Sequence, residues 1–102
     1  MAKGYWIARV DVGDPTAYQD YVAANAEVFA RYKARFLVRG GRHEAVEGKA
    51  RERNVVLEFP SYQAALECYH SPEYARAKAL RQNASDGDLV VIEGYDGPQP
   101  DA

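Results

Sequence analysis

Hydrophobic and polar residues alternate near the start of the chain, and this spacing of two predicts a β-strand over residues 5–12. One side of this strand carries Trp6, Ala8, Val10 and Val12, and the other carries Tyr5, Ile7, Arg9 and Asp11. Gly13 ends the alternation. Asp14 followed by Pro15 then marks a helix start, because aspartate caps free backbone N–H groups and proline suits the first turn. Apolar residues recur every three or four positions up to Tyr32, so the helix is amphipathic, with Asn25 as the polar interruption of its apolar stripe.

The rest of the chain predicts three more strands and one interrupted helix. The strands are expected at residues 35–39, 54–59 and 89–92, the last buried on both faces. Gly40-Gly41 suggests a bulge after the second strand, residues 42–47 are expected to continue extended, and residues 48–53 form the connection to the third. The second helix starts after the cap Ser61, is interrupted at His70, and resumes at Ser71-Pro72 as far as about Asn83.

This order of elements predicts an α+β, ferredoxin-like βαββαβ fold, with a four-stranded antiparallel sheet in the order 4-1-3-2 and two helices on one face. The other face would expose Tyr5, Ile7, Leu37, Val56 and one side of residues 89–92, more apolar surface than a soluble monomer usually leaves in water. We therefore expect a homodimer whose sheets face each other as a dimeric α+β barrel. Residues 1–95 are expected to form one domain, and residues 96–102, rich in Gly, Pro and Asp, a flexible tail.

Several short segments, taken together, resemble the family of unknown function numbered 1330 (DUF1330), from about Gly4 to Gly94. They are Gly4-Tyr5-Trp6-Ile7, Asp14-Pro15 with Tyr18 and Tyr21, Arg35 to Gly41, Glu58-Phe59-Pro60-Ser61, Tyr69 with Ser71-Pro72-Glu73-Tyr74, and Leu80-Arg81 followed by Asp88-Leu89. The resemblance implies a dimeric α+β barrel. The wider superfamily includes cofactor-free monooxygenases, haem-degrading oxygenases and muconolactone isomerases, but no residue pattern here maps onto their catalytic groups. The catalytic residues are therefore unknown at this point.

Composition and residue spacing argue against several partners, locations and cofactors. The chain has 13 basic and 15 acidic residues, a net charge of −2 and no long basic run, so nucleic acid is not an expected partner. The first residues lack the apolar segment of a signal peptide, and no stretch approaches membrane-spanning length. Cys68 is the single cysteine, which excludes an internal disulfide and favours the reducing cytoplasm. The two histidines lack the spacing of zinc ligands, and we expect no metal and no cofactor.

The residues after the second strand are the first candidates for ligand binding. Arg39 and Arg42 flank the Gly40-Gly41 pair and could hold a carboxylate or enolate through bidentate hydrogen bonds, while His43 could move a proton. Arginines beside glycines at a bulge are also a common structural feature without function. Trp6 and Tyr18, on predicted core-facing positions, are expected as walls of a pocket between helices and sheet.

A second candidate group lies on the uncovered sheet face. The expected strand order makes Arg9 and Glu58 neighbours there, beside Tyr5 and Ile7, and alternation places Arg39 on the same face. These charges either form an interfacial ion-pair network that sets the dimer register or line a polar site inside the barrel.

Two functions are compatible with these residues. The first is binding of a small organic molecule beside the sheet, with cofactor-free oxygenation or isomerisation as the reaction that the resemblance suggests. The alternative is a non-catalytic dimeric binding or assembly module. The sequence assigns no reaction to either.

Overall fold

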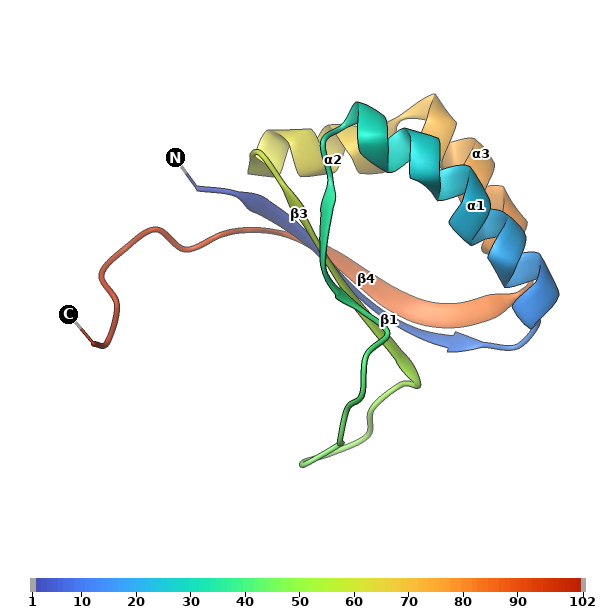
Figure 1. The fold of residues 1–102 in the computed structure, drawn as a ribbon, viewed down its shortest axis with the longest axis horizontal. Coiled ribbons are helices and arrows are strands. Elements are labelled where there is room, and N and C mark those ends of the chain that lie inside the picture. Colours follow the sequence, from blue (N-terminus) through green and yellow to red (C-terminus); the bar gives the residue numbers. More distant parts are fainter. Residues whose placement is uncertain (1, 102) are drawn as a thin grey trace.

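The computed structural model describes residues 2–101 and has seven regular elements, shown in Figure 1. They are β1 (Gly4–Val12), α1 (Pro15–Arg31), β2 (Arg35–Arg39), β3 (Arg53–Phe59), α2 (Tyr62–His70), α3 (Pro72–Arg81) and β4 (Ser85–Glu93). The four strands form one antiparallel sheet in the order β2-β3-β1-β4, and the helices cover one of its faces (Figure 1). The ferredoxin-like fold and the strand order predicted from the sequence are confirmed.

The first helix begins and ends at local backbone signals. The backbone N–H of Ala17 donates to Asp14 Oδ1 at 3.2 Å, and Pro15 occupies the first turn, as the sequence predicted. At the other end Lys33 adopts a left-handed φ of 60°, and Ala34 N–H donates to the Phe29 carbonyl at 2.9 Å. This termination directs the chain from α1 back toward the sheet, where β2 begins.

The second predicted helix is two helices, α2 and α3, joined at Ser71. The Ser71 hydroxyl donates to the Cys68 carbonyl at 2.7 Å and accepts the N–H of Tyr74 at 3.1 Å, so one side chain serves both helix ends. Pro72 occupies the first turn of α3, where its missing N–H costs nothing. The expected interruption at His70 is confirmed, and it produces three helices on the sheet rather than two.

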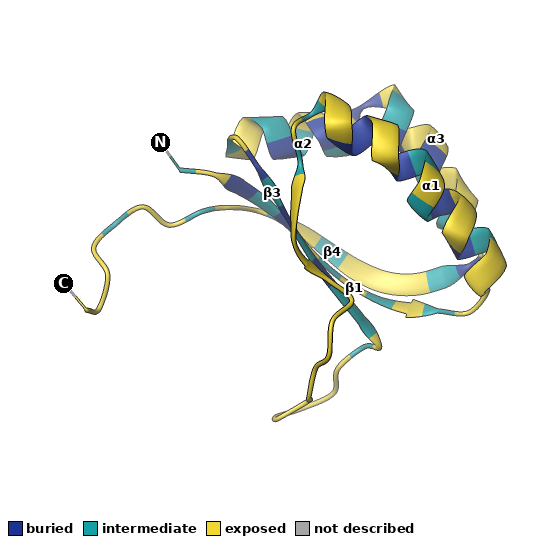
Figure 2. Cartoon of the chain, viewed as in Figure 1, coloured by how far each residue is buried: buried dark blue, intermediate teal, exposed yellow. Residues whose placement is uncertain are grey.

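Trp6 is the centre of the core. Its side chain is 1% exposed, its indole N–H donates to the Ala65 carbonyl at 2.9 Å, and this bond connects β1 to α2. The rings of Phe29, Phe59, Tyr69 and Tyr74 surround it, with centroids 5.0–5.8 Å from that of Trp6. Figure 2 shows buried residues concentrated where helices and sheet face each other.

Three sequence expectations about the sheet were wrong. Residues 40–52 form no strand but an exposed connection that projects from the sheet (Figures 1 and 2), so residues 42–47 do not continue β2. The strand expected at residues 89–92 begins earlier, at Ser85, because residues 85–88 pair with residues 9–12 of β1. It is not buried on both faces either, since Val90 is 52% and Ile92 is 48% exposed.

Candidate functional site

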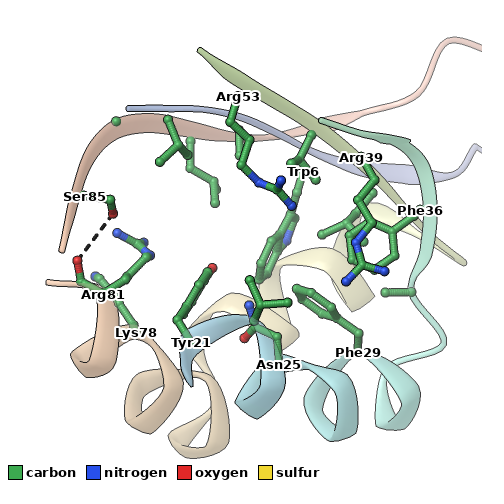
Figure 3. A pocket seen from close by; sticks show the side chains of 18 of the residues that line it. Trp6, Tyr21, Asn25, Phe29, Phe36, Arg39, Arg53, Lys78, Arg81 and Ser85 are labelled. Atoms are coloured by element: carbon green, nitrogen blue, oxygen red, sulfur yellow. Dashed lines mark hydrogen bonds between the residues drawn. The ribbon is translucent and has the colours of Figure 1, made fainter. Parts of the chain in front are cut away.

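A cavity of about 600 Å³ lies between α1 and the inner face of the sheet (Figure 3). Its floor follows from the strand register, which aligns Arg39, Val55, Ala8 and Leu89 in one row across all four strands. Trp6 precedes Ala8 and Val10 on the same side of β1. The side chains of Ala8 and Val10 are smaller than that of Trp6, so they fill less of the space between the sheet and α1. The roof is α1, which packs against α3 and presents Ala26 and Ala30 to the cavity. Small residues on both walls leave the space open.

A bulge in β2 brings Arg39 to this cavity. Phe36 pairs with Leu57 while Val38 pairs with Val56, so Leu37 is an extra residue and the alternation shifts by one. As a result Phe36 and Arg39 lie on the inner face. The expectation that Arg39 shares the outer face with Arg9 was therefore wrong, because the irregularity lies before the glycine pair and not within it.

Four cationic side chains line the cavity: Arg39, Arg53, Lys78 and Arg81. The three arginines lie against aromatic rings. Arg39 Cζ is 4.1 Å from the Phe36 ring centroid, Arg53 Cζ is 5.8 Å from that of Tyr18, and Arg81 Cζ is 5.4 Å from that of Tyr21. Lys78 Nζ donates to the Tyr69 hydroxyl at 2.9 Å, and Arg81 donates to the Tyr74 hydroxyl at 3.4 Å. Aromatic rings thus hold the cations toward the cavity without neutralising them.

Within residues 2–101, none of these four cations forms a salt bridge. One carboxylate, that of Asp88, borders the cavity, but its Oδ2 pairs with Arg51 Nε at 3.1 Å. Because arginine and lysine remain protonated at neutral pH, the cavity has an excess of positive charge. Such a site favours an anionic ligand.

The hydroxyls of Tyr18 and Tyr74 remain protonated at neutral pH. Burial raises the pKa of Tyr18 above its ordinary value of 10.0, and nearby Tyr21 raises it further against the opposing guanidinium groups of Arg53 and Arg81. Burial likewise raises the pKa of Tyr74, whose hydroxyl lies 2.7 Å from that of Tyr21. These groups can donate hydrogen bonds to an anion but are poor bases.

Two buried polar atoms at the cavity have no hydrogen-bond partner among residues 2–101, Asn25 Oδ1 and Arg53 Nε. Asn25 is 5% exposed and comes from α1, whereas Arg53 comes from the sheet (Figure 3). An unsatisfied buried polar group costs about 1–3 kcal/mol, so proteins rarely keep one without a use. A bound anion can accept from the Arg53 Nε–H, and a ligand hydroxyl can donate to Asn25 Oδ1, so a molecule with both groups would remove that cost.

The structure brings some of the sequence candidates together and separates others. Trp6, Tyr18 and Arg39, predicted ligand-binding residues, all line the cavity. His43 does not, because it lies in the exposed connection, where its Nδ1 is 3.3 Å from the Gly41 carbonyl. Arg53 and Arg81 were missed by sequence reasoning; Arg53 follows two charged residues in a segment that was interpreted as a loop.

The four residues expected at an interface share the outer face of the sheet. Tyr5, Ile7 and Arg9 alternate with inward residues on β1, and Tyr5 pairs with Glu58 across to β3. The Tyr5 hydroxyl donates to Glu58 at 3.5 Å, and Arg9 donates to the Lys49 carbonyl at 3.1 Å. Glu58 also pairs with Arg35 at 3.7 Å. The charges on this face are thus partly satisfied within one chain.

Other chemistries have little support in the described residues. No three His, Cys, Asp or Glu side chains gather as metal ligands among residues 2–101. Cys68 is fully buried, and burial raises the pKa of its thiol to about 12, so it is not a thiolate at neutral pH. Within the same range, no helix has the length and apolar character needed to cross a membrane.

The model of the domain of unknown function DUF1330 matches residues 3–95. The chain belongs to the DUF1330 family. No curated protein matches it. Its fold resembles that of a protein of unknown function from Rhodopseudomonas palustris, with 20% identity and a TM-score of 0.75 over 94% of this chain and 85% of that one. The cofactor-independent oxygenase SnoaB from Streptomyces nogalater is 16% identical, with a TM-score of 0.63 over 98% and 99% of the two chains.

A dimeric ferredoxin-like protein of unknown function from Thermobifida fusca is also similar to this DUF1330 chain. It is 15% identical, with a TM-score of 0.58 over 90% of this chain and 89% of that one. At such identities the likeness shows a shared fold. The ferredoxin-like architecture is therefore found in proteins described as dimeric, as oxygenases and as having no known function.

Proposed function

We propose that this protein binds a small organic acid, enol or phenol in its ionised form, in the cavity between α1 and the sheet. The observation that carries the proposal is the set of four cations, Arg39, Arg53, Lys78 and Arg81, which line the cavity and form no salt bridge within residues 2–101. A volume of about 600 Å³ lies in the range of small-molecule sites and suits a ligand of one to three rings.

Electrostatics favour the ionised ligand strongly. A cation about 4–6 Å from an acid lowers the pKa of that acid by about 1–3 units, and several cations face this cavity. An enol or phenol that is neutral in water would therefore ionise more readily when bound. The aromatic walls, Trp6, Tyr18, Tyr21 and Phe29 among them, suit a flat apolar body.

Cofactor-free oxygenation of the bound anion is a second candidate, supported by the structural likeness to SnoaB over nearly all of both chains. The substrate loses a C–H proton to solvent, and its carbanion forms a C–O bond with O2, which accepts the electron pair. The resulting peroxide anion is protonated and then loses water, so CH2 and O2 become C=O and H2O. The protein's part is to stabilise the enolate with Arg53, Lys78 and Arg81, because the cavity offers no free carboxylate or histidine as base.

A second copy of the chain is proposed to cover the outer face of the sheet. Ile7 and Val90 pair directly there, beside Ile92, and all three are exposed. Burying such apolar surface is favourable by about 25 cal/mol per Å², and a similar protein of the same fold is described as dimeric. In this homodimer Tyr5, Ile7, Arg9 and Glu58 belong to the interface.

Calorimetric titration with 2-naphthoate and its neutral counterpart 2-naphthamide tests the binding function. Arg53→Gln removes a cavity charge, and Arg42→Gln removes the same charge from the exposed connection as the matched control. We expect 2-naphthoate to bind at least about tenfold more tightly than the amide, and Arg53→Gln to weaken it about tenfold with little effect of Arg42→Gln. If neither probe binds, the non-catalytic assembly module becomes the better account.

An oxygen electrode tests the second candidate with the enolisable ketone 2-tetralone. Oxygenation predicts one O2 consumed per ketone oxidised, at a rate that falls in Arg81→Gln. The contrary result is O2 consumption no faster than in buffer alone, measured with protein that binds 2-naphthoate. It would refute oxygenation of this class of ketone and leave binding as the function.

Sedimentation at low micromolar concentration tests the homodimer. Val90→Lys places a charge in the middle of the outer face and should yield monomers. Val46→Lys adds the same charge in the exposed connection and should leave the dimer intact. A wild-type particle of single-chain mass would remove the proposed assembly.

A further inference from the structure

We infer that the ligand of the cavity is an aromatic dianion, with one anionic group at each end of a flat apolar body. The inference rests on the proposed binding function and narrows it to a substrate class. It follows from the placement of three cations on opposite sides of the cavity: Arg39 on the edge strand β2, and Lys78 and Arg81 on α3.

The two ends of the cavity are far apart in the fold. Arg39 lies on β2, at one edge of the sheet, and shares a row with Leu89 on β4, at the other edge. Three inter-strand spacings separate these positions, about 14 Å at about 4.8 Å each. Arg81 ends α3 beside this second edge, where the Ser85 hydroxyl donates to its carbonyl. Figure 3 shows Arg81 and Lys78 on one side of the cavity and Arg39 on the opposite side.

Each end retains unused donors. Arg81 has five N–H groups, and its contacts with the hydroxyls of Tyr74 and Tyr21 leave several of them unused. Lys78 has three and donates one, to Tyr69. Arg39 stacks on Phe36, a contact that orients the guanidinium without using its N–H groups. Both ends can therefore form charge-assisted hydrogen bonds with a carboxylate.

The sheet floor between the ends is apolar except for Arg53. Trp6 lies between Arg39 and Arg81 in Figure 3, and Val55 and Leu57 lie beside it on the sheet floor. Arg53 also lies between the two ends (Figure 3), so its charge attracts an anion at either end. Replacing Arg53 should therefore lower the affinity for monoanions and dianions alike. Replacing Arg39 or Arg81 should affect the affinities for the two classes differently.

Calorimetric titration with naphthalene-2,6-dicarboxylate and with 2-naphthoate tests whether the ligand is a dianion. The two probes share the naphthalene ring and differ only in carrying two carboxylates or one. We expect the dicarboxylate to bind about tenfold more tightly to the wild type. Arg39→Gln and Arg81→Gln should each abolish that advantage. Because 2-naphthoate can occupy only one end, one of these two variants should leave its affinity unchanged. Arg42→Gln controls for the loss of a positive charge outside the cavity.

The outcomes separate this inference from the binding function. Equal wild-type affinities for the two probes, or an advantage of the dicarboxylate that survives Arg39→Gln, would overturn the dianion while leaving anion binding in place. Failure of 2-naphthoate itself to bind would overturn both. Arg39 is exposed and its side chain stacks on Phe36, so its replacement should leave the fold intact even if Arg81→Gln lowers stability.

Discussion

Asn25 offers a direct test of whether the cavity is built for a ligand at the expense of stability. Its side chain is 5% exposed, and its Oδ1 has no hydrogen-bond partner among residues 2–101. A buried acceptor without a partner costs about 1–3 kcal/mol. Asn25→Leu replaces the amide by an apolar group of similar shape on a helix, where leucine also has the higher helix propensity. The free energy of unfolding of the ligand-free protein should therefore increase by about 1–2 kcal/mol.

Ser71 provides the matched control, because among residues 2–101 it is the other buried polar residue and its hydroxyl both donates and accepts a hydrogen bond. Its hydroxyl donates to the Cys68 carbonyl and accepts the Tyr74 N–H. Ser71→Ala removes a helix cap and should lower the free energy of unfolding by about 1 kcal/mol. The two substitutions thus have opposite expected signs at almost equal burial.

Urea denaturation monitored by the fluorescence of Trp6, the single tryptophan, measures both variants. In thermal denaturation, Asn25→Leu should raise Tm by about 4–8 °C for each kcal/mol gained. A loss of stability of 1 kcal/mol or more in Asn25→Leu would show that the amide has a structural role, and the reasoning would fail.

Two further predictions concern the core and the start of β1. Burial, with a smaller contribution from Glu73, raises the pKa of Cys68 from 9.0 to about 12. Above pH 9 the unfolded chain therefore loses the thiol proton that the folded chain keeps, and the free energy of unfolding should fall as pH rises toward 12, with a shallower slope in Cys68→Ala. Equal slopes in urea denaturation across this range would contradict the assignment. A Cβ on Gly4 would collide with the backbone of Ser61, so Gly4→Ala should lower the free energy of unfolding by about 2–3 kcal/mol, whereas Gly41→Ala, with nothing within 4 Å, should have little effect. Similar stabilities of these two variants in urea would show that the close approach at Gly4 is not real.

The fold followed from local signals that need no tertiary context. Alternation in residues 5–12, the Asp14-Pro15 cap and the Ser71-Pro72 restart each specify an element through backbone hydrogen bonds that lie within a few residues. The length of β4 did not follow, because residues 85–88 have turn composition and become a strand only by pairing with β1.

The site was predicted only in part, for a related reason. Trp6 and Tyr18 were identified as cavity walls from helical and strand periodicity. Arg39 was placed on the wrong face because one extra residue, Leu37, reverses the alternation, and nothing in a run of five strand-forming residues marks where a bulge falls. Arg53 and Arg81 were missed because a charged residue at a strand start or helix end is usually solvated, and only packing shows which ones turn inward.

The central claim is that the cavity holds an organic anion against these inward-facing cations. A crystal structure of the protein grown with 2-naphthoate tests it most directly. The account predicts the naphthalene ring beside Trp6, with its carboxylate within hydrogen-bond distance of at least one of the four cavity cations. A cavity that contains only water, with the naphthoate bound on the outer face of the sheet or absent, would contradict it.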